Sequence, residues 1–254
     1  MELPVNEFKR AIKAGRQQIG LWCSLSHHYS LEVVATSGFD WLLIDTEHSP
    51  NEVTAVLSQL QAVAPHPVSP VVRPAWNDPV LIKRHLDIGA QTLLLPYIQS
   101  EEEAAQAVAS IRYPPRGIRG VGTMVRATQF GRISDYARRC EEELCLLVQI
   151  ENRPGLDALE RIAKLDGIDG VFIGPSDLAA SLGHLGNPGH PEVQAAIVDA
   201  IKRVRACGKA PGVLTPDEEM ARRYIEAGTL FTAVGIDAGI LARETTRLAH
   251  RFKS

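Results

Sequence analysis

The chain has 254 residues, of which 45% are hydrophobic and 22% charged, and this is the composition of an ordinary globular protein. It excludes disordered, collagen-like and coiled-coil chains, and the length allows one large domain with a full hydrophobic core. The formal net charge is only −3. Neither nucleic acid nor an anionic membrane is therefore indicated as a partner, and we expect small-molecule ligands.

The amino-terminal segment MELPVNEFKRAIKAG is charged and lacks the apolar region of a signal peptide. No apolar run reaches the roughly 20 residues of a membrane span. The four cysteines show no C-x-x-C spacing, which favours buried free thiols in a reducing compartment. We therefore expect a cytoplasmic protein.

Eight apolar runs of strand length recur along the chain. They are nearly continuous in apolar residues rather than alternating, as strands buried on both faces require. The predicted strands cover residues 19–25, 41–47, 68–74, 92–98, 144–151, 170–177, 210–215 and 230–237.

Segments with helical periodicity lie between these runs. Asn51, Asn77 and Thr215 suit helix starts, and Gly89 and Gly228 suit helix ends. Eight β/α units in about 250 residues predict one TIM-barrel domain over 1–254, with a doubly wound open sheet as the alternative. A helix over 5–15 should cap the barrel floor. The other predicted helices cover residues 51–64, 78–88, 101–111, 154–165, 191–207, 216–228 and 238–252.

The longest irregular segment, 112–132, follows the predicted helix 101–111 and contains several glycines and five arginines. Long loops of this kind in compact domains are usually functional. The segment could hold an anion, pack on a neighbouring subunit or be a solvated surface loop.

Polar residues at the carboxyl ends of barrel strands are the candidates for chemistry. Glu151 and Asp177 end adjacent predicted strands, and two such carboxylates suit a hard divalent cation such as Mg²⁺ or Mn²⁺. The alternative is that both acids pair with arginines or cap helices.

A histidine and an arginine end two further strands. His48 follows Asp45 by three residues, so a bond between them could orient the imidazole for proton transfer. Arg73 could bind a substrate carboxylate or enolate oxygen, or it could form a structural pair with Asp45 or Glu47. The predicted strands contain no lysine, which disfavours Schiff-base chemistry. Signatures of α/β-hydrolases, P-loops and dinucleotide-binding folds are absent from the sequence.

The segments WLLIDTEHSPN, PVVRPAWNDP, RYPPRGIRGVG, LVQIE and GVFIGPSDL resemble the HpcH/HpaI family of class II pyruvate aldolases. The resemblance implies a TIM barrel that assembles as a homohexamer by helix exchange. It also implies retro-aldol cleavage of a 4-hydroxy-2-oxo acid, with 4-hydroxy-2-oxoheptanedioate as first choice, to pyruvate and an aldehyde. The cofactor it implies is Mg²⁺, Mn²⁺ or Co²⁺.

Several residues match the family's site. The resemblance makes Glu151 and Asp177 metal ligands, His48 the general base and Arg73 the transition-state stabiliser. It makes Gln149 and Ser176 substrate contacts, and Asp87 a residue that raises the basicity of the histidine, a role that Asp45 could share. Leu214, at the end of the seventh predicted strand, is expected to line the aldehyde pocket.

Three other functions remain open from the sequence. One is a 2-keto-3-deoxy sugar-acid aldolase of the same family. The second is a barrel enzyme that forms the same enolate from an acyl-CoA or a phosphoenolpyruvate-type substrate. The third is a non-catalytic binding barrel.

Overall fold

The computed structural model describes residues 1–253 and contains a closed barrel of eight parallel strands, each hydrogen-bonded to its sequence neighbours, with β8 closing onto β1. This confirms the predicted TIM barrel and excludes the open sheet. The strands are β1 (Gln18–Cys23), β2 (Trp41–Asp45), β3 (Ser69–Arg73), β4 (Thr92–Leu95), β5 (Cys145–Ile150), β6 (Gly170–Ile173), β7 (Ala210–Leu214) and β8 (Phe231–Ile236).

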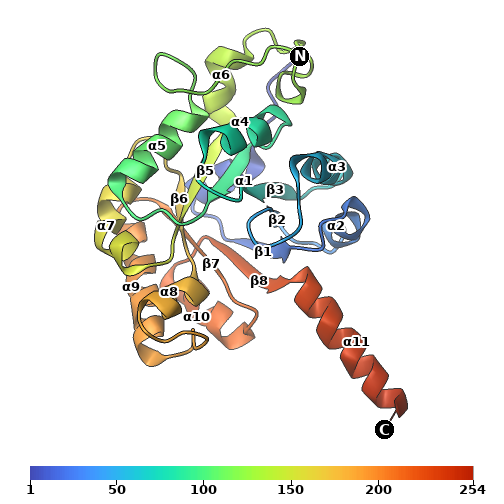
Figure 1. The fold of residues 1–254 in the computed structure, drawn as a ribbon, viewed down its shortest axis with the longest axis vertical. Coiled ribbons are helices and arrows are strands. Elements are labelled where there is room, and N and C mark those ends of the chain that lie inside the picture. The colour runs from blue at the N-terminus through green and yellow to red at the C-terminus, as the bar shows by residue number, and fades with distance from the viewer. Residues whose placement is uncertain (254) are drawn as a thin grey trace.

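Most helices lie around the outside of the barrel, whereas the first one closes its floor and the last one extends away from it (Figure 1). They are α1 (Glu7–Lys13), α2 (His28–Ala35), α3 (Val53–Val63), α4 (Pro79–Asp87), α5 (Glu101–Ile111), η1 (Arg126–Thr128), α6 (Tyr136–Glu143), α7 (Arg153–Lys164), α8 (Pro175–Ser181), α9 (Pro191–Ala206), α10 (Glu218–Ala227) and α11 (Asp237–Lys253). None of these helices is both long and apolar enough to cross a membrane.

The sequence prediction misplaced some helix boundaries. Asp78 and Asp217, rather than Asn77 and Thr215, cap α4 and α10 with their side chains. Asn51 does not cap α3, because its amide is engaged by the backbone oxygen of Asp45 and by the side chain of Gln59. The helices α2, α6 and α8 were not predicted. These three helices have only seven or eight residues each, so their periodicity is too short to be recognised in the sequence.

The amino ends of the strands form the barrel floor. Phe8 of α1 enters the barrel there, with its ring centroid 5.8 Å from those of both Trp41 and Phe231. All three side chains are fully buried. A Cβ on Gly212 would lie 2.1 Å from the Phe231 ring, so glycine is required beside this aromatic cluster. The predicted floor-capping helix is thereby confirmed, with bounds two residues shorter at each end.

Residues on the strands alternate between two hydrophobic clusters. On β2, Leu42 and Ile44 belong to the large cluster between the sheet and the helices, whereas Trp41 and Leu43 belong to the cluster inside the barrel. Asp45 continues the inward series. The same alternation places polar residues inside the barrel at the carboxyl ends of the strands. We call this end of the barrel the rim.

Candidate active site

A cavity of about 330 Å³ opens at the rim of the barrel. Most of its residues come from the last inward position of a strand or from the loop that follows it. The lining residues are Trp22, Ser24, Asp45, His48, Arg73, Gln149, Glu151, Phe172, Gly174, Pro175, Ser176, Asp177, Leu214 and Ile236. The cavity therefore contains every predicted site residue except Asp87.

Arg73 is the most constrained polar residue of the cavity. Its Nε and Nη2 donate to the two carboxylate oxygens of Asp45 at 2.9 and 2.8 Å, and its Nη1 lies 2.7 Å from Oε2 of Glu47. The guanidinium also lies over the ring of Trp22, 4.7 Å from its centroid. The predicted structural pairing is thus formed. Two of the five N–H groups of the guanidinium donate to Asp45, and Nη1 forms an ion pair with Glu47 without a hydrogen bond to its Oε2, so N–H groups remain for a ligand.

Asp45 binds Arg73 and not His48, so the expected contact between Asp45 and His48 is wrong. Burial favours the neutral form of Asp45, but the hydrogen bonds and charge of Arg73 outweigh burial and lower its pKa. Asp45 also accepts hydrogen bonds from the indole of Trp22 and from the backbone N–H of Glu47. The two oxygens of Asp45 thus accept four hydrogen bonds, from Arg73, Trp22 and Glu47, and no lone pair is left for the imidazole of His48.

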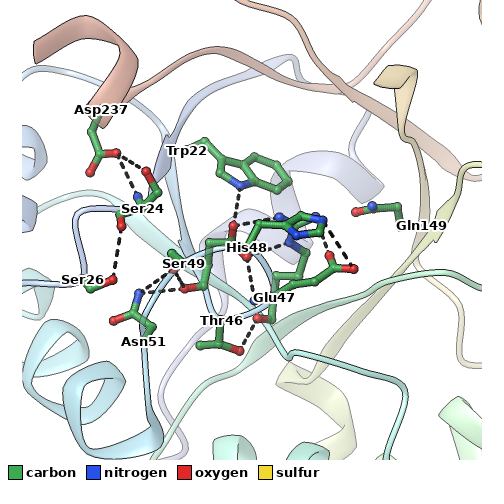
Figure 2. A network of polar contacts seen from close by, with 12 residues as sticks. Trp22, Ser24, Ser26, Thr46, Glu47, His48, Ser49, Asn51, Gln149 and Asp237 are labelled. Carbon is green, nitrogen blue, oxygen red and sulfur yellow. Dashed lines mark hydrogen bonds and ion pairs between the residues drawn. The ribbon is translucent and has the colours of Figure 1, made fainter. Parts of the chain in front are cut away.

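His48 lies in the loop after β2, where 67% of its side chain is exposed. The nearest acid is Glu47, with Oε1 3.8 Å from Nε2 of the imidazole. Figure 2 shows His48 beside Glu47, between Trp22 and Gln149. The imidazole is therefore free to contact a ligand in the cavity.

Glu151 is a buried carboxylate held on both oxygens. Oε1 accepts from the backbone N–H of Tyr97 at 2.9 Å, and Oε2 accepts from the side chain of Gln149 at 2.5 Å. Tyr97 has φ +58°, a strained conformation for a residue with a side chain, and this conformation aims its N–H at Glu151. Burial, and then the charges of Glu47 and Asp177, raise the pKa of Glu151 to about 7.

The prediction that Asp177 ends a strand is wrong, because β6 stops at Ile173 and Pro175 begins α8. Proline suits the first turn of a helix, so the boundary lies four residues earlier than the apolar run suggested. Asp177 is exposed in the first turn of α8, beside Ser176. Both side chains still line the cavity.

Asp87 and the segment 112–132 lie away from this cavity within one chain. Asp87 is the last residue of α4, and its carboxylate accepts a hydrogen bond from Nη2 of Arg119 at 3.0 Å. Its role toward His48 stays a prediction. The five arginines of the segment all have partners in the described chain, and the segment lines a different hollow near Leu3 and Ala90. Leu214, by contrast, lines the cavity, and its contact with the aldehyde stays a prediction.

Glu47 pairs with Arg73, one of the alternatives that the sequence offered, and burial followed by the charges of Asp45 and Asp177 raises its pKa. Two other contributors were missed by sequence reasoning. Trp22 supports the guanidinium, and the backbone of Tyr97 holds Glu151. The alternation of inward positions on β1 could have identified Trp22, whereas no sequence signal marks a backbone donor.

The donors in the cavity fit a hard divalent cation. The charges of Glu47 and Asp177 help to raise the pKa of Glu151, which indicates that the three carboxylates lie near one another. The buried Oε1 of Gln149 has no hydrogen-bond partner among the described residues. A Cβ on Gly174 would lie 2.6 Å from Oε2 of Glu151, so glycine is needed to seat this carboxylate. An all-oxygen set of this kind suits Mg²⁺ or Mn²⁺.

A TIM barrel with buried carboxylates, an arginine and an accessible imidazole at its rim defines a barrel enzyme for a small anionic substrate. Comparison with known proteins makes the class specific. The model of the family described as HpcH/HpaI aldolase/citrate lyase matches residues 18–243. The chain therefore belongs to this family, and it is an aldolase.

Similar proteins span the whole chain. A pyruvate aldolase from Rhizobium etli is 65% identical and is covered over 99% of both chains. A 4-hydroxy-2-oxo-heptane-1,7-dioate aldolase from Klebsiella pneumoniae is 59% identical over 97% of this chain and 94% of that one. The crystal structure of an HpcH/HpaI aldolase/citrate lyase family protein from Burkholderia cenocepacia has a TM-score of 0.95 at 41% identity, covering 98% of this chain and 100% of the other.

Proposed function

We propose that this protein catalyses the reversible, metal-dependent retro-aldol cleavage of a 4-hydroxy-2-oxo acid. The proposed substrate is 4-hydroxy-2-oxoheptanedioate, and the products are pyruvate and succinic semialdehyde. The observation that carries the proposal is that Glu151, Asp177, Arg73 and His48 line one cavity. The 59% identity to a 4-hydroxy-2-oxo-heptane-1,7-dioate aldolase supports the choice of substrate.

In this cleavage the bond between C3 and C4 breaks and the C4 hydroxyl loses its proton to become the aldehyde. The three-carbon fragment gains a proton at C3, which becomes the methyl group of pyruvate. A divalent ion such as Mg²⁺, Mn²⁺ or Co²⁺, held by Glu151 and Asp177, would supply Lewis-acid polarisation of the 2-oxo group. The residues of the chain must orient the substrate and move the proton.

Arg73 holds the oxygen on which negative charge develops. The N–H groups that do not bind Asp45 are the donors, while Asp45 and Glu47 fix the guanidinium so that little reorganisation is needed. Gln149 contacts the oxygens of the 2-oxo acid from β5, and Ser176 does so from the first turn of α8. His48 moves the proton, because it is the accessible imidazole of the cavity and has no competing short contact with an acid.

The aldehyde is received by the apolar side of the cavity. Leu214, Trp22, Phe172 and Ile236 form this side. Among the described residues that line the cavity, Arg73 is the only side chain that is always cationic, so a terminal carboxylate of the aldehyde must reach beyond this lining. A single pocket contact discriminates by only about 1–3 kcal/mol, so we expect a preference among aldehydes rather than strict selectivity.

The proposed assembly is a homohexamer in which each barrel domain exchanges a helix with a neighbour. The support is α11, which extends away from the barrel (Figure 1). Its apolar residues are exposed, with Leu241 at 53%, Leu248 at 54% and Phe252 at 83%. An apolar stripe on an isolated helix requires a packing partner.

Isotope exchange tests the chemistry. With Mn²⁺ and pyruvate in D₂O, we expect the methyl signal of pyruvate to decay in the presence of enzyme, to persist with EDTA, and to decay again when Mn²⁺ is restored. Glu151→Gln should slow the exchange by at least about 100-fold. Covalent trapping of pyruvate by borohydride would overturn the proposal, because it would require a Schiff base.

Turnover of defined substrates tests the aldehyde. We expect the highest kcat/KM with 4-hydroxy-2-oxoheptanedioate, compared with 4-hydroxy-2-oxopentanoate and 2-keto-3-deoxy sugar acids. A sugar acid favoured by more than roughly 100-fold would replace the proposed substrate with the sugar-acid alternative.

A further inference from the structure

Outside the active site, His184, His190 and Glu192 come together between the end of α8 and the first turn of α9. One possible ligand atom of each lies within 4.8 Å of those of the other two. Nε2 of His184 lies 2.9 Å from Oε2 of Glu192, and the two imidazole rings stack with centroids 3.5 Å apart. None of the three side chains is buried, so a dissolved ion can reach them.

The backbone fixes the positions of these residues. Gly183, with φ +88°, lies just after the end of α8, and the N–H of His184 donates to the backbone oxygen of Ala179 at 2.7 Å. His190 is the N-cap of α9, and its N–H donates to the backbone oxygen of Asn187 at 3.1 Å. The three side chains therefore project from an ordered turn, and binding an ion would require only side-chain rotations.

We propose that His184, His190 and Glu192 form a second metal site, selective for a transition-metal ion such as Zn²⁺ over Mg²⁺. Two imidazoles and one carboxylate are three ligands that Zn²⁺ accepts, with water in a fourth position. Two ligand atoms bound at about 2.0–2.1 Å lie roughly 2.9–3.4 Å apart, which matches the separation of His184 and Glu192. The ion replaces the proton shared by this pair.

The site differs chemically from the active site. The active-site cavity offers carboxylate and amide oxygens, which suit Mg²⁺, whereas imidazole nitrogens favour Zn²⁺, Ni²⁺ or Co²⁺. The positive charge of Arg153 opposes the binding of a metal ion at this site, because its Nη2 lies 3.8 Å from Oε1 of Glu192. A bound ion would tie the end of α8, the helix that carries Asp177, to the start of α9.

Zinc binding by the full, tag-free chain tests this site. In equilibrium dialysis with excess Mg²⁺, we expect one Zn²⁺ per chain that Mg²⁺ does not displace. His184→Gln and Glu192→Gln should each weaken this binding by at least about tenfold, and Arg153→Ala should strengthen it. His250→Gln, which removes an exposed histidine on α11, is the matched control and should leave binding unchanged.

Glu151→Gln separates the two sites. This variant should retain the Mg²⁺-resistant zinc even though aldol chemistry is lost, so the result does not depend on the proposed function. Zinc that disappears with Glu151→Gln but persists in His184→Gln would place the ion in the active site and overturn the proposal. Failure of the unmodified chain to retain zinc against Mg²⁺ would overturn it as well.

Discussion

The floor of the barrel carries aromatic side chains, whereas the rim carries charges, although the same strands supply both. β2 runs from Trp41, packed against Phe8 and Phe231, to Asp45, which is bonded to Arg73. Both ends are buried. At the floor, contacts among apolar side chains stabilise the folded state. At the rim, hydrogen bonds must offset the cost of desolvating the charges.

This difference separates stability from activity along a single strand. At the floor, a change of side-chain volume should alter the free energy of unfolding and leave the chemistry intact. At the rim, a change of donor geometry should alter the chemistry and leave the fold intact. Each of the following variants tests one side of this comparison.

Phe231→Ala should have the largest effect on stability. The side chain is fully buried at the floor, so its removal leaves a cavity and should lower the free energy of unfolding by about 3–5 kcal/mol. Denaturant unfolding at fixed protein concentration measures this change, with Tyr29→Ala, an exposed aromatic on α2, as the control. Loss of kcat per folded molecule would contradict the separation of floor and rim.

Arg73→Lys should have the next largest effect, on activity rather than stability. A lysine keeps the positive charge beside Asp45. It cannot, however, form the two parallel hydrogen bonds of the guanidinium to Asp45 and donate to a ligand at the same time. We expect kcat/KM to fall by about 10²–10³-fold. Arg222→Lys, at an exposed pair with Glu218, should have no effect. Full activity of Arg73→Lys would mean that the arginine has only a structural role.

His48→Ala should slow the exchange of the pyruvate methyl group by about 100-fold, because the accessible imidazole moves the proton. Metal affinity should be unchanged, and Mn²⁺ binding measured in the same variant checks this. His28→Ala removes an exposed histidine at the start of α2 and serves as the control. An unaltered exchange rate would transfer the proton-moving role to another group.

Most of the fold could be predicted because its signals are local. Eight apolar runs and the turn residues between them identified every strand, and Gly228 ended α10 as expected. Signals failed where a side-chain hydrogen bond, rather than the propensity of a single residue, decides the structure. Asn51 suits a helix cap, yet it is engaged by Asp45 and Gln59 instead.

The site could be predicted as a set of residues but not as a set of bonds. Residues at the last inward position of a strand, such as Arg73 and Gln149, point into the barrel because side chains alternate along a strand. Sequence spacing suggested that Asp45 binds His48, three residues away. The chain instead pairs Asp45 with Arg73 on the next strand, since opposite charges at the same level of the barrel are closer than neighbours in a loop.

His85 adds a third location to the comparison, because it is a buried titratable group on an outer helix and does not line the cavity at the rim. Its side chain on α4 is 2% exposed, and its Nδ1 has no partner among the described residues. Burial, and then the charge of Arg84, lower its pKa to about 4 from 6.5. The unfolded chain therefore binds a proton at a pH where the folded chain does not.

The stability associated with neutral His85 is present above about pH 6.5 and is lost as the pH falls toward 4. Between about pH 7.5 and 5.5, the free energy of unfolding should fall by about 1.4 kcal/mol through this residue. Comparing the same pH difference in His85→Leu isolates the effect, because other titrating groups contribute equally to both chains. His250→Gln should keep the full slope, whereas an equal slope in His85→Leu would show that the imidazole accepts its proton without unfolding.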